Sequence, residues 1–168
     1  MNVNLTTQNV ALNLFYYGLT VVLFPWIILS LEATFGITRH PSAVTGVPSI
    51  LLGIMGAALQ LRCIFLFQSL GSGTPSPALA PTKLVTGGPY GWIRNPMNVG
   101  ELLIFAALAG WFGSPFLLGY TILAGLAFHG FIVLWEEPRH LTLFREEYIK
   151  YKTRVRRWLP KLINNNSD

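Results

Sequence analysis

The feature that most constrains this chain is a series of four long apolar stretches within 168 residues. Residues 11–31 and 47–70 are each long enough to cross about 30 Å of hydrocarbon as a helix. Residues 101–112 and 116–135 form a closely spaced pair that is joined by a short turn. Because lipid offers the backbone no hydrogen-bond partner, segments that span a bilayer in this way must be helical. The sequence therefore predicts an all-α integral membrane bundle of about four transmembrane helices.

The composition supports a surface that faces lipid. Hydrophobic residues make up 52% of the chain, charged residues only 11%, and the mean hydropathy is +0.48. A soluble domain carries about a quarter charged residues, so this chain has too few charges to cover a surface in water. Its length predicts a single domain, residues 1–168. The lone cysteine, Cys63, excludes an internal disulfide and a multi-cysteine metal site, and no metal ligands are predicted.

The basic residues are unevenly distributed, and this predicts the orientation in the membrane. Eight of the twelve Lys and Arg residues lie within residues 139–161. With the N-terminus inside, this tail, Lys83 and Arg94 are all inside, and only Arg39 is outside, as in most membrane proteins. We expect both termini in the cytoplasm, at a bacterial inner membrane rather than the endoplasmic reticulum, since no retention signal ends the chain. The basic tail suits anionic lipid, and without a nucleic-acid-binding motif no nucleic-acid partner is predicted.

The expected domain divides into four parts along the chain. Residues 1–70 hold the first two spans, residues 71–98 a polar loop, residues 99–135 a helical hairpin and residues 136–168 the basic tail. Within the tail, apolar side chains recur at spacings of three and four over residues 139–155, which is typical of a helix with one apolar face. We expect an amphipathic cytoplasmic helix there, lying on the membrane surface or under the bundle.

Local signals support the helices of the hairpin and of the second span. Ser114 and Pro115 are a favourable N-cap and first residue for the last span. The helix before them is expected to begin near Pro96, since residues 101–112 alone are short for a full span. Gly53 and Ala57 form a pair of small residues that would allow another helix to approach closely.

Two adjacent carboxylates, Glu136 and Glu137, stand at the inner end of a helix that otherwise lacks charge. At that position they must meet water, a cation or a partner, and a solvated helix end is the simple alternative. Pro138 disfavours helix at the residue before it, so we expect a bend there. His129 lies seven residues before Glu136, on nearly the same helical stripe. It could belong to a polar cavity or hydrogen-bond to a neighbouring helix.

A second polar group precedes the third apolar stretch. Asn95 and Pro96 are a helix-start signal, and Gly100 permits close approach of another chain segment. The free backbone N–H groups of such a helix start favour an anion, and Arg94 could add a bidentate contact to a carboxylate. The alternative is an arginine that extends to the membrane interface.

The sequence lacks the motifs of several well-known reaction classes. The sequence contains no Gly-x-Gly-x-x-Gly, no phosphate-binding P-loop, no Gly-x-Ser-x-Gly and no His-Glu-x-x-His. A nucleophilic triad, a zinc protease and nucleotide-driven transport are therefore not predicted. A small transporter has no support either, because no repeat of broken helices is visible.

The run LVTGGPYGWIRNPMNVGE, followed by EEP and then by FREEYIKYKTRVRRWLP, resembles the isoprenylcysteine carboxyl methyltransferase and phospholipid methyltransferase superfamily. The resemblance covers residues 71–160, and two blocks in this order around a helical hairpin are more specific than either alone. It implies S-adenosyl-L-methionine as the methyl donor and S-adenosyl-L-homocysteine as the product. The cofactor would lie at the cytoplasmic end of the last spans, so residues 71–98 become the cofactor-site loop.

The resemblance also implies the site residues. Arg94 and Glu136 are the expected catalytic residues, and the expected cofactor-binding residues are Tyr90, Arg94, Asn95, Pro96, Asn98, Gly100, His129, Glu136 and Glu137. Two positions depart from the family pattern. Asn98 stands where relatives commonly have tyrosine, which affects one cofactor or acceptor contact, and Arg145 stands where they commonly have glycine.

The expected reaction is methyl transfer to a lipophilic acceptor that enters from the bilayer. A prenylcysteine-like carboxylate, on a small molecule or a prenylated acceptor, is preferred because TGGPYGWIRNPMN resembles the carboxyl methyltransferase branch. The alternatives are a phospholipid or other amine or thiol acceptor, and a non-catalytic relative that binds a partner in the membrane. Membrane lipid is an expected partner, and the oligomeric state stays open.

Overall fold

The computed structural model describes residues 15–69 and 83–160, apart from the side chains of residues 67 and 68. Three helices are long and apolar enough to cross a membrane, Phe15–Thr34, Ala43–Leu66 and Pro115–Arg154, and the apolar helix Pro96–Phe112 is shorter. The described residues contain helices and loops, with a single isolated bridge between strand-like residues. The predicted all-α membrane bundle is confirmed, with three long helices and one shorter one. The first part of the polar loop, residues 71–82, lies outside the described residues.

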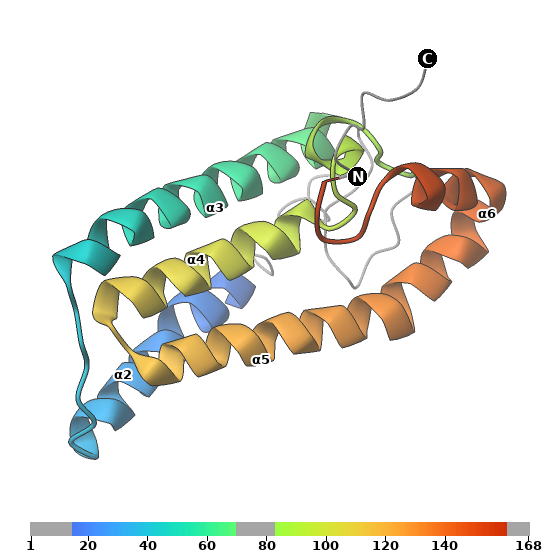
Figure 1. Cartoon of the computed structure of the whole chain (residues 1–168). Coiled ribbons are helices and arrows are strands. Elements are labelled where there is room, and N and C mark those ends of the chain that lie inside the picture. The colour runs from blue at the N-terminus through green and yellow to red at the C-terminus, as the bar shows by residue number, and fades with distance from the viewer. Residues whose placement is uncertain (1–14, 70–82, 161–168) are drawn as a thin grey trace, which may run out of the picture.

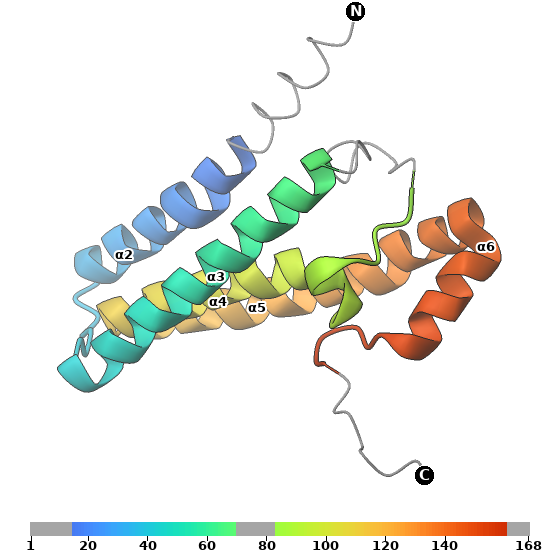
Figure 2. The ribbon, with the colours of Figure 1, turned by 90° about the horizontal axis from the view of Figure 1, so that it is seen from above.

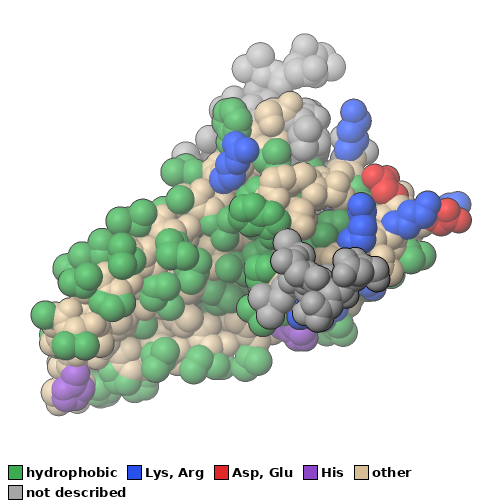
Figure 3. All heavy atoms as spheres, turned by 45° about the horizontal axis from the view of Figure 1, so that its top comes forward, with side chains coloured by type: hydrophobic (Ala, Val, Ile, Leu, Met, Phe, Trp, Pro, Cys, Tyr) green, Lys and Arg blue, Asp and Glu red, His purple; other side chains and the backbone are tan. Residues whose placement is uncertain are grey.

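The helices run along one common direction, and most of their charges lie toward one end. The first helix is π-helical over Gly18–Leu23 and continues as α2, Phe24–Thr34, while α3 spans Ala43–Ser69, α4 spans Pro96–Phe112 and α5 spans Pro115–Phe131. In Figures 1 and 2 the first helix stands at the side of the bundle formed by α3, α4 and α5. Hydrophobic side chains cover most of the face in Figure 3, whereas Lys, Arg, Asp and Glu gather toward the end near α6 (Glu137–Arg154).

Small residues let α3 and α4 pack closely. A Cβ atom built on Gly56 would lie 2.6 Å from the Gly100 carbonyl oxygen, and one on Gly53 would lie 3.5 Å from the Ala107 Cβ. Backbones can approach this closely only where side chains are minimal. Gly53 therefore faces α4 as predicted. The second small residue of α3 in this interface is Gly56, whereas Ala57 is exposed. The close approach expected at Gly100 is confirmed.

The turn between α4 and α5 is built as the sequence predicts. Gly113 ends α4 in the left-handed conformation, with φ of 59°, which glycine adopts without strain. The Ser114 hydroxyl accepts a hydrogen bond from the Leu117 N–H at 3.0 Å, and Pro115 is the first residue of α5. The helix before this turn begins at Pro96, also as expected.

The first helix is attached to this turn by a buried carboxylate. Glu32 is 0% exposed, and its Oε1 accepts hydrogen bonds from the Ser114 hydroxyl at 2.6 Å and the Phe116 N–H at 3.1 Å. Arg39 lies beside the other carboxylate oxygen, with Nε and Oε2 3.8 Å apart. A negative charge at a helix N-terminus is stabilising because the free N–H groups point toward it. Glu32 thus joins the first helix to the start of α5.

Replacing Glu32 by alanine is expected to lower the unfolding free energy by about 2 kcal/mol, because two buried donors lose their acceptor. Thermal unfolding in detergent measures this. Glu32→Gln is expected to lose less, since the amide keeps one acceptor oxygen. Thr34→Ala is the matched control, because its hydroxyl donates to the Ser30 carbonyl of the same helix. Equal melting temperatures for Glu32→Ala and Thr34→Ala would contradict this role.

Hydrogen bonds also attach the other end of the first helix. Glu101 of α4 is 3% exposed, and its carboxylate accepts from the Thr20 hydroxyl at 3.0 Å and the Tyr16 hydroxyl at 3.3 Å. The Tyr17 hydroxyl donates to the Gln60 side chain at 2.8 Å, and the Tyr120 hydroxyl donates to the Thr20 carbonyl at 3.1 Å. The first helix is therefore attached at both ends by polar contacts.

The expected bend between Glu136 and Pro138 is wrong. Residues Ile132–Glu136 form π-helical turns, and Glu137 is helical, with φ of −64° and ψ of −43°. The Glu137 N–H bonds to the Ile132 carbonyl, five residues back. A proline clashes with the carbonyl four residues before it in a regular α-helix, and the wider π-helical turn relieves that clash. The helix therefore runs on through both glutamates into α6.

The predicted tail helix is present as α6, but it is interrupted once. Arg145 has φ of 41° and ψ of −116°, which is not helical. After this break, Tyr148, Tyr151 and Val155 are buried together, with Leu84, Leu141 and Phe144 packed against them. The tail thus folds back along the bundle end, as the turn in α6 in Figure 1 shows.

Candidate functional site

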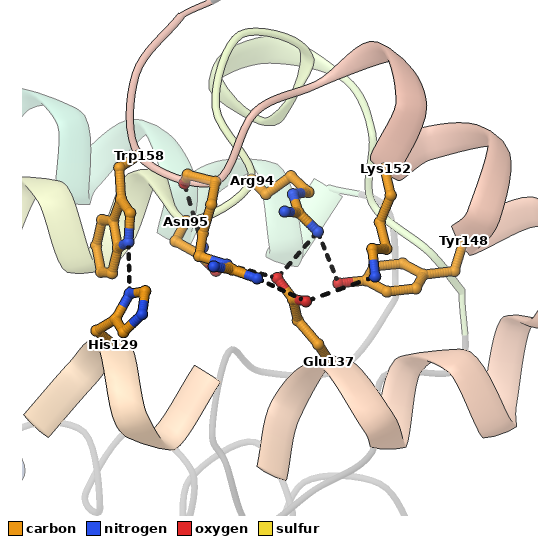
Figure 4. Close-up of polar contacts among 8 residues, drawn as sticks. Arg94, Asn95, His129, Glu137, Tyr148, Lys152 and Trp158 are labelled. Atoms are coloured by element: carbon orange, nitrogen blue, oxygen red, sulfur yellow. Dashed lines mark hydrogen bonds and ion pairs between the residues drawn. The ribbon is translucent and has the colours of Figure 1, made fainter. Parts of the chain in front are cut away.

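Three segments that are distant in sequence meet at one end of the bundle. They are the start of α4, the junction of α5 with α6, and the extended segment that follows α6. A parallel bridge joins Ile93 to Arg156, and the Arg94 N–H donates to the Arg156 carbonyl at 2.9 Å. Figure 4 shows the side chains that converge between these segments.

At the centre lies the carboxylate of Glu137, which is 7% exposed. Its Oε1 lies 2.9 Å from Arg94 Nη1 and 2.7 Å from Arg157 Nε. Its Oε2 lies 3.0 Å from Arg157 Nη2 and 3.7 Å from Lys152 Nζ. Bidentate arginine–carboxylate pairs of this kind are among the stronger polar contacts in proteins. One carboxylate therefore holds three cationic side chains together.

Arg94 is deeply buried in this cluster, with a side chain only 10% exposed. Its Nη1 also donates to the Tyr148 hydroxyl at 3.4 Å. Its Nε is buried and has no hydrogen-bond partner among the described residues. Buried guanidinium N–H groups are normally paired, so Arg94 retains a donor for a further acceptor.

The start of α4 supports the cluster. Pro96 is among the most deeply buried side chains and is the first residue of the helix. The Asn95 side-chain amide donates to the Arg157 carbonyl at 3.2 Å, so it fixes the segment after α6 and does not cap α4. The first N–H groups of α4 therefore have no side-chain cap, which is the arrangement that attracts anions at helix starts.

Tyr90, four residues before Arg94, is held in place by two hydrogen bonds. Its carbonyl accepts a hydrogen bond from the Tyr151 hydroxyl at 2.7 Å, and its phenol is hydrogen-bonded to the Cys63 thiol. Desolvation raises the pKa of the Tyr90 phenol well above its ordinary value. The phenol is therefore neutral at physiological pH and acts as a hydrogen-bonding group, not as an anion.

Glu136 differs from its neighbour in its contacts. It is partly buried, and within residues 15–69 and 83–160 it forms no ion pair. The two adjacent carboxylates are thus distinct, because Glu137 is neutralised by cations and Glu136 is not. From the sequence alone, the contacts of the two glutamates could not be distinguished.

Three predicted site residues do not reach the cluster. His129 is exposed and accepts a hydrogen bond from the Trp158 indole at 3.1 Å, with the two rings stacked (Figure 4). Gly100 packs against Gly56 of α3, and the partly buried Asn98 side chain has no hydrogen bond within the described residues. A cavity of about 610 Å³ lies at the other end of the bundle, beside Arg39 and Trp111, away from all of these.

The cluster also contains residues that the sequence did not single out as functional. They are Lys152 and Arg157, with Tyr148 hydrogen-bonded to Arg94, and the neighbouring Trp158 is hydrogen-bonded to His129 beside the cluster. The hydrogen bond to Glu137 raises the pKa of the Arg157 guanidinium above its ordinary value. All four lie in the run FREEYIKYKTRVRRWLP, which was used for the resemblance and as a basic tail, but none of them was assigned to the site.

Comparison with known proteins gives one match. The model of the family described as phospholipid methyltransferase matches residues 44–147, which include Arg94, Glu136 and Glu137. The first helix and residues 148–168 lie outside the matched range. No curated protein and no solved structure is similar enough to count as a match.

Proposed function

The chain belongs to the phospholipid methyltransferase family, and we propose that it transfers a methyl group from S-adenosyl-L-methionine to a lipophilic acceptor at the end of the bundle where Arg94 meets Glu137. The family is one of membrane methyltransferases, which implies this methyl donor. The contact of 2.9 Å between these two side chains carries the proposal. It joins the two sequence blocks on which the expected site depends.

The residues present fit this cofactor. When bound, it supplies an electrophilic methyl group on a sulfonium and leaves as S-adenosyl-L-homocysteine. The buried Arg94 Nε without a partner, together with the uncapped start of α4, is suited to its carboxylate. Glu136, which forms no ion pair with any described cation, is suited to its ammonium and sulfonium groups. Arg94 and Glu136 are therefore the proposed catalytic residues, and Tyr90, Asn95, Pro96 and Glu137 shape their surroundings.

Three of the expected cofactor-binding residues lie apart from the Glu137 cluster. His129 is hydrogen-bonded to Trp158, and Gly100 is used in helix packing. Asn98 is close in sequence to the uncapped helix start, so its amide could still contact the cofactor or the acceptor. Asn98 belongs to the proposed site, whereas His129 and Gly100 support it from outside the cluster.

A carboxylate acceptor is the preferred substrate class. It is ionised at neutral pH and needs no base before it attacks a methyl group. An amine must first lose a proton, and two candidate bases are occupied, since His129 is held by Trp158 and Glu137 by three cations. A prenylcysteine-like acid satisfies this requirement and is soluble in the bilayer. The second candidate is a phospholipid amine. It is favoured by the family description and by Glu136, which forms no ion pair with a described cation.

We propose that this end of the bundle faces the cytoplasm. The described Lys and Arg side chains gather at the α6 end, as Figure 3 shows, whereas Arg39 lies at the opposite end. Basic residues favour the cytoplasmic side. A cytoplasmic site would also receive a water-soluble methyl donor directly, while the acceptor enters sideways from lipid.

Titration of the detergent-purified protein with S-adenosyl-L-homocysteine tests the cofactor site. We expect saturable binding in the micromolar range and a loss of about tenfold or more in Glu136→Gln, because one charge-assisted contact is removed. Glu146→Gln, an exposed carboxylate of α6, is the matched control. No binding to the wild-type protein at millimolar ligand would refute the methyltransferase proposal.

Labelling with the methyl donor tests the acceptor. Radioactive methyl groups are followed into an S-prenylated N-acetylcysteine and into the phospholipid fraction of a membrane extract. We expect base-labile label, as in a methyl ester, in the prenylated acid. Label confined to phospholipid headgroups would instead select the amine reaction.

A further inference from the structure

The Glu137 cluster contains more positive charge than its carboxylates neutralise. Arg94, Lys152 and Arg157 surround the single carboxylate of Glu137. Even when Glu136 is counted, cations exceed carboxylates by one. The other two acids of α6, Glu146 and Glu147, are exposed and form no ion pair with these cations. Unbalanced charge that is partly removed from water is costly, and a bound anion would lower that cost.

The three cations differ in accessibility. The Arg94 side chain is 10% exposed, whereas those of Arg157 and Lys152 are 26% and 35% exposed. Lys152 also has the weakest contacts of the three, because its Nζ lies 3.7 Å from Glu137 and 5.8 Å from the centre of the Tyr148 ring. Neither distance is a hydrogen bond. A ligand can therefore reach Lys152 and Arg157 without dismantling the contact between Arg94 and Glu137.

We infer that Lys152 and Arg157 bind the negatively charged headgroup of the methyl acceptor, and that they determine its selection over a neutral one. This inference rests on the proposed function, since it assigns the acceptor of the same site. The cofactor carries one net positive charge, so its binding increases the surplus around Glu137. A carboxylate acceptor reduces the surplus and an ammonium acceptor increases it, which favours the acid.

The same arrangement accounts for release of the product. One carboxylate oxygen can be held by Lys152 or Arg157 while a lone pair of the other forms the new O–CH₃ bond. The S–CH₃ bond breaks, its electron pair returns to sulfur, and no proton is transferred. The resulting ester is neutral and loses its attraction to both cations. Arg157 then keeps its ion pair with Glu137.

Equilibrium binding in the presence of saturating S-adenosyl-L-homocysteine tests this inference without turnover. The ligands are an S-prenylated N-acetylcysteine and its methyl ester, which differ in one charge. The indole of Trp158, next to Arg157 and stacked on His129, provides a fluorescence signal. We expect the acid to bind the wild-type protein about tenfold more tightly than the ester. A factor of this size corresponds to one partly desolvated charge contact.

Lys152→Gln is expected to weaken acid binding about threefold to tenfold and to leave ester binding unchanged. Arg157→Gln is expected to weaken acid binding more than ester binding, because it also breaks the pair that fixes the segment after α6. Lys152→Arg, which keeps the positive charge, is expected to bind the acid as the wild-type protein does. Arg154→Gln removes an exposed cation from the same helix and is the matched control. Lys152→Gln keeps the test valid if Arg157→Gln, which loses its pair with Glu137, does not fold.

Different results separate this inference from the proposed function. If S-adenosyl-L-homocysteine does not bind the wild-type protein, the proposed function fails. If it binds, but acid and ester bind equally, the inference alone is overturned. The inference is also overturned if Lys152→Gln weakens both ligands alike, or if Arg154→Gln has the same effect as Lys152→Gln. If vesicles of anionic phospholipid occupy the site and the acid does not displace them, the two cations bind bulk lipid and the acceptor role is refuted.

Discussion

Replacing Glu137 by glutamine is expected to lower the unfolding free energy by about 3 kcal/mol, one of the two largest effects in this protein. The side chain keeps its volume, but Arg94, Arg157 and Lys152 lose the carboxylate that holds them together. Removing one partner of a buried ion pair is costly because the remaining charge stays poorly solvated. The same variant is expected to lose binding of S-adenosyl-L-homocysteine, because the segment after α6 would no longer be fixed. Thermal unfolding in detergent and ligand titration measure the two effects.

Two further variants make this prediction specific. Glu146→Gln changes an exposed carboxylate of the same helix and is expected to unfold within about 0.5 kcal/mol of the wild-type protein. Glu136→Gln is expected to reduce ligand binding with little change in stability, because Glu136 neutralises no described cation. If Glu136→Gln and Glu137→Gln destabilise the protein equally, the division of roles between the two glutamates is wrong.

Replacing Gly56 by alanine is expected to lower the unfolding free energy by about 2 kcal/mol, and Gly56→Val by more. The added Cβ would lie 2.6 Å from the Gly100 carbonyl oxygen and 2.9 Å from the Ile104 Cγ1. Because the first of these atoms belongs to the backbone of α4, the two helices must separate to make room. Separation would also displace the start of α4, so loss of cofactor binding is expected to accompany the loss of stability.

The controls for this prediction are glycines of α5. A Cβ on Gly119 or Gly130 meets nothing within 4 Å. Alanine at either position is expected to be neutral or stabilising by about 0.5 kcal/mol, because it removes the conformational freedom of glycine in a helix. A melting temperature of Gly56→Ala that matches that of Gly119→Ala would show that α3 and α4 do not pack as described.

Much of the fold could be predicted because the signals are local. The apolar stretches and the Ser114-Pro115 start of α5 depend on neighbouring residues, and both are confirmed. The meeting of Arg94 with Glu137 could not be derived from periodicity. It was expected from the resemblance, which treats two distant blocks as parts of one site. The roles proposed for the individual site residues stay predictions.

The remaining features depend on contacts between distant segments, which a single sequence does not specify. Gly100 was expected to permit a close approach, but nothing in the sequence selects Gly56 as its partner until α3 and α4 are placed side by side. The prediction of a bend before Pro138 was wrong because the preference of a residue before proline for extended backbone was overcome by the π-helical turn upstream. Arg157 looked like one more basic residue in the tail, and only the return of the chain after Arg145 brings it to Glu137.

The first helix has a consequence for how the protein is handled. Only Pro25 and Glu32 of α2 are buried, so its docking relies on the hydrogen bonds of Glu32 at one end and of Glu101 at the other. In hydrocarbon those donors and acceptors have no competitor, whereas water that penetrates a loose micelle competes for them. The choice of solubilising agent therefore decides whether this helix stays associated. Preparations in nanodiscs are expected to retain it, and those in short-chain detergents are expected to release it while the rest of the bundle persists.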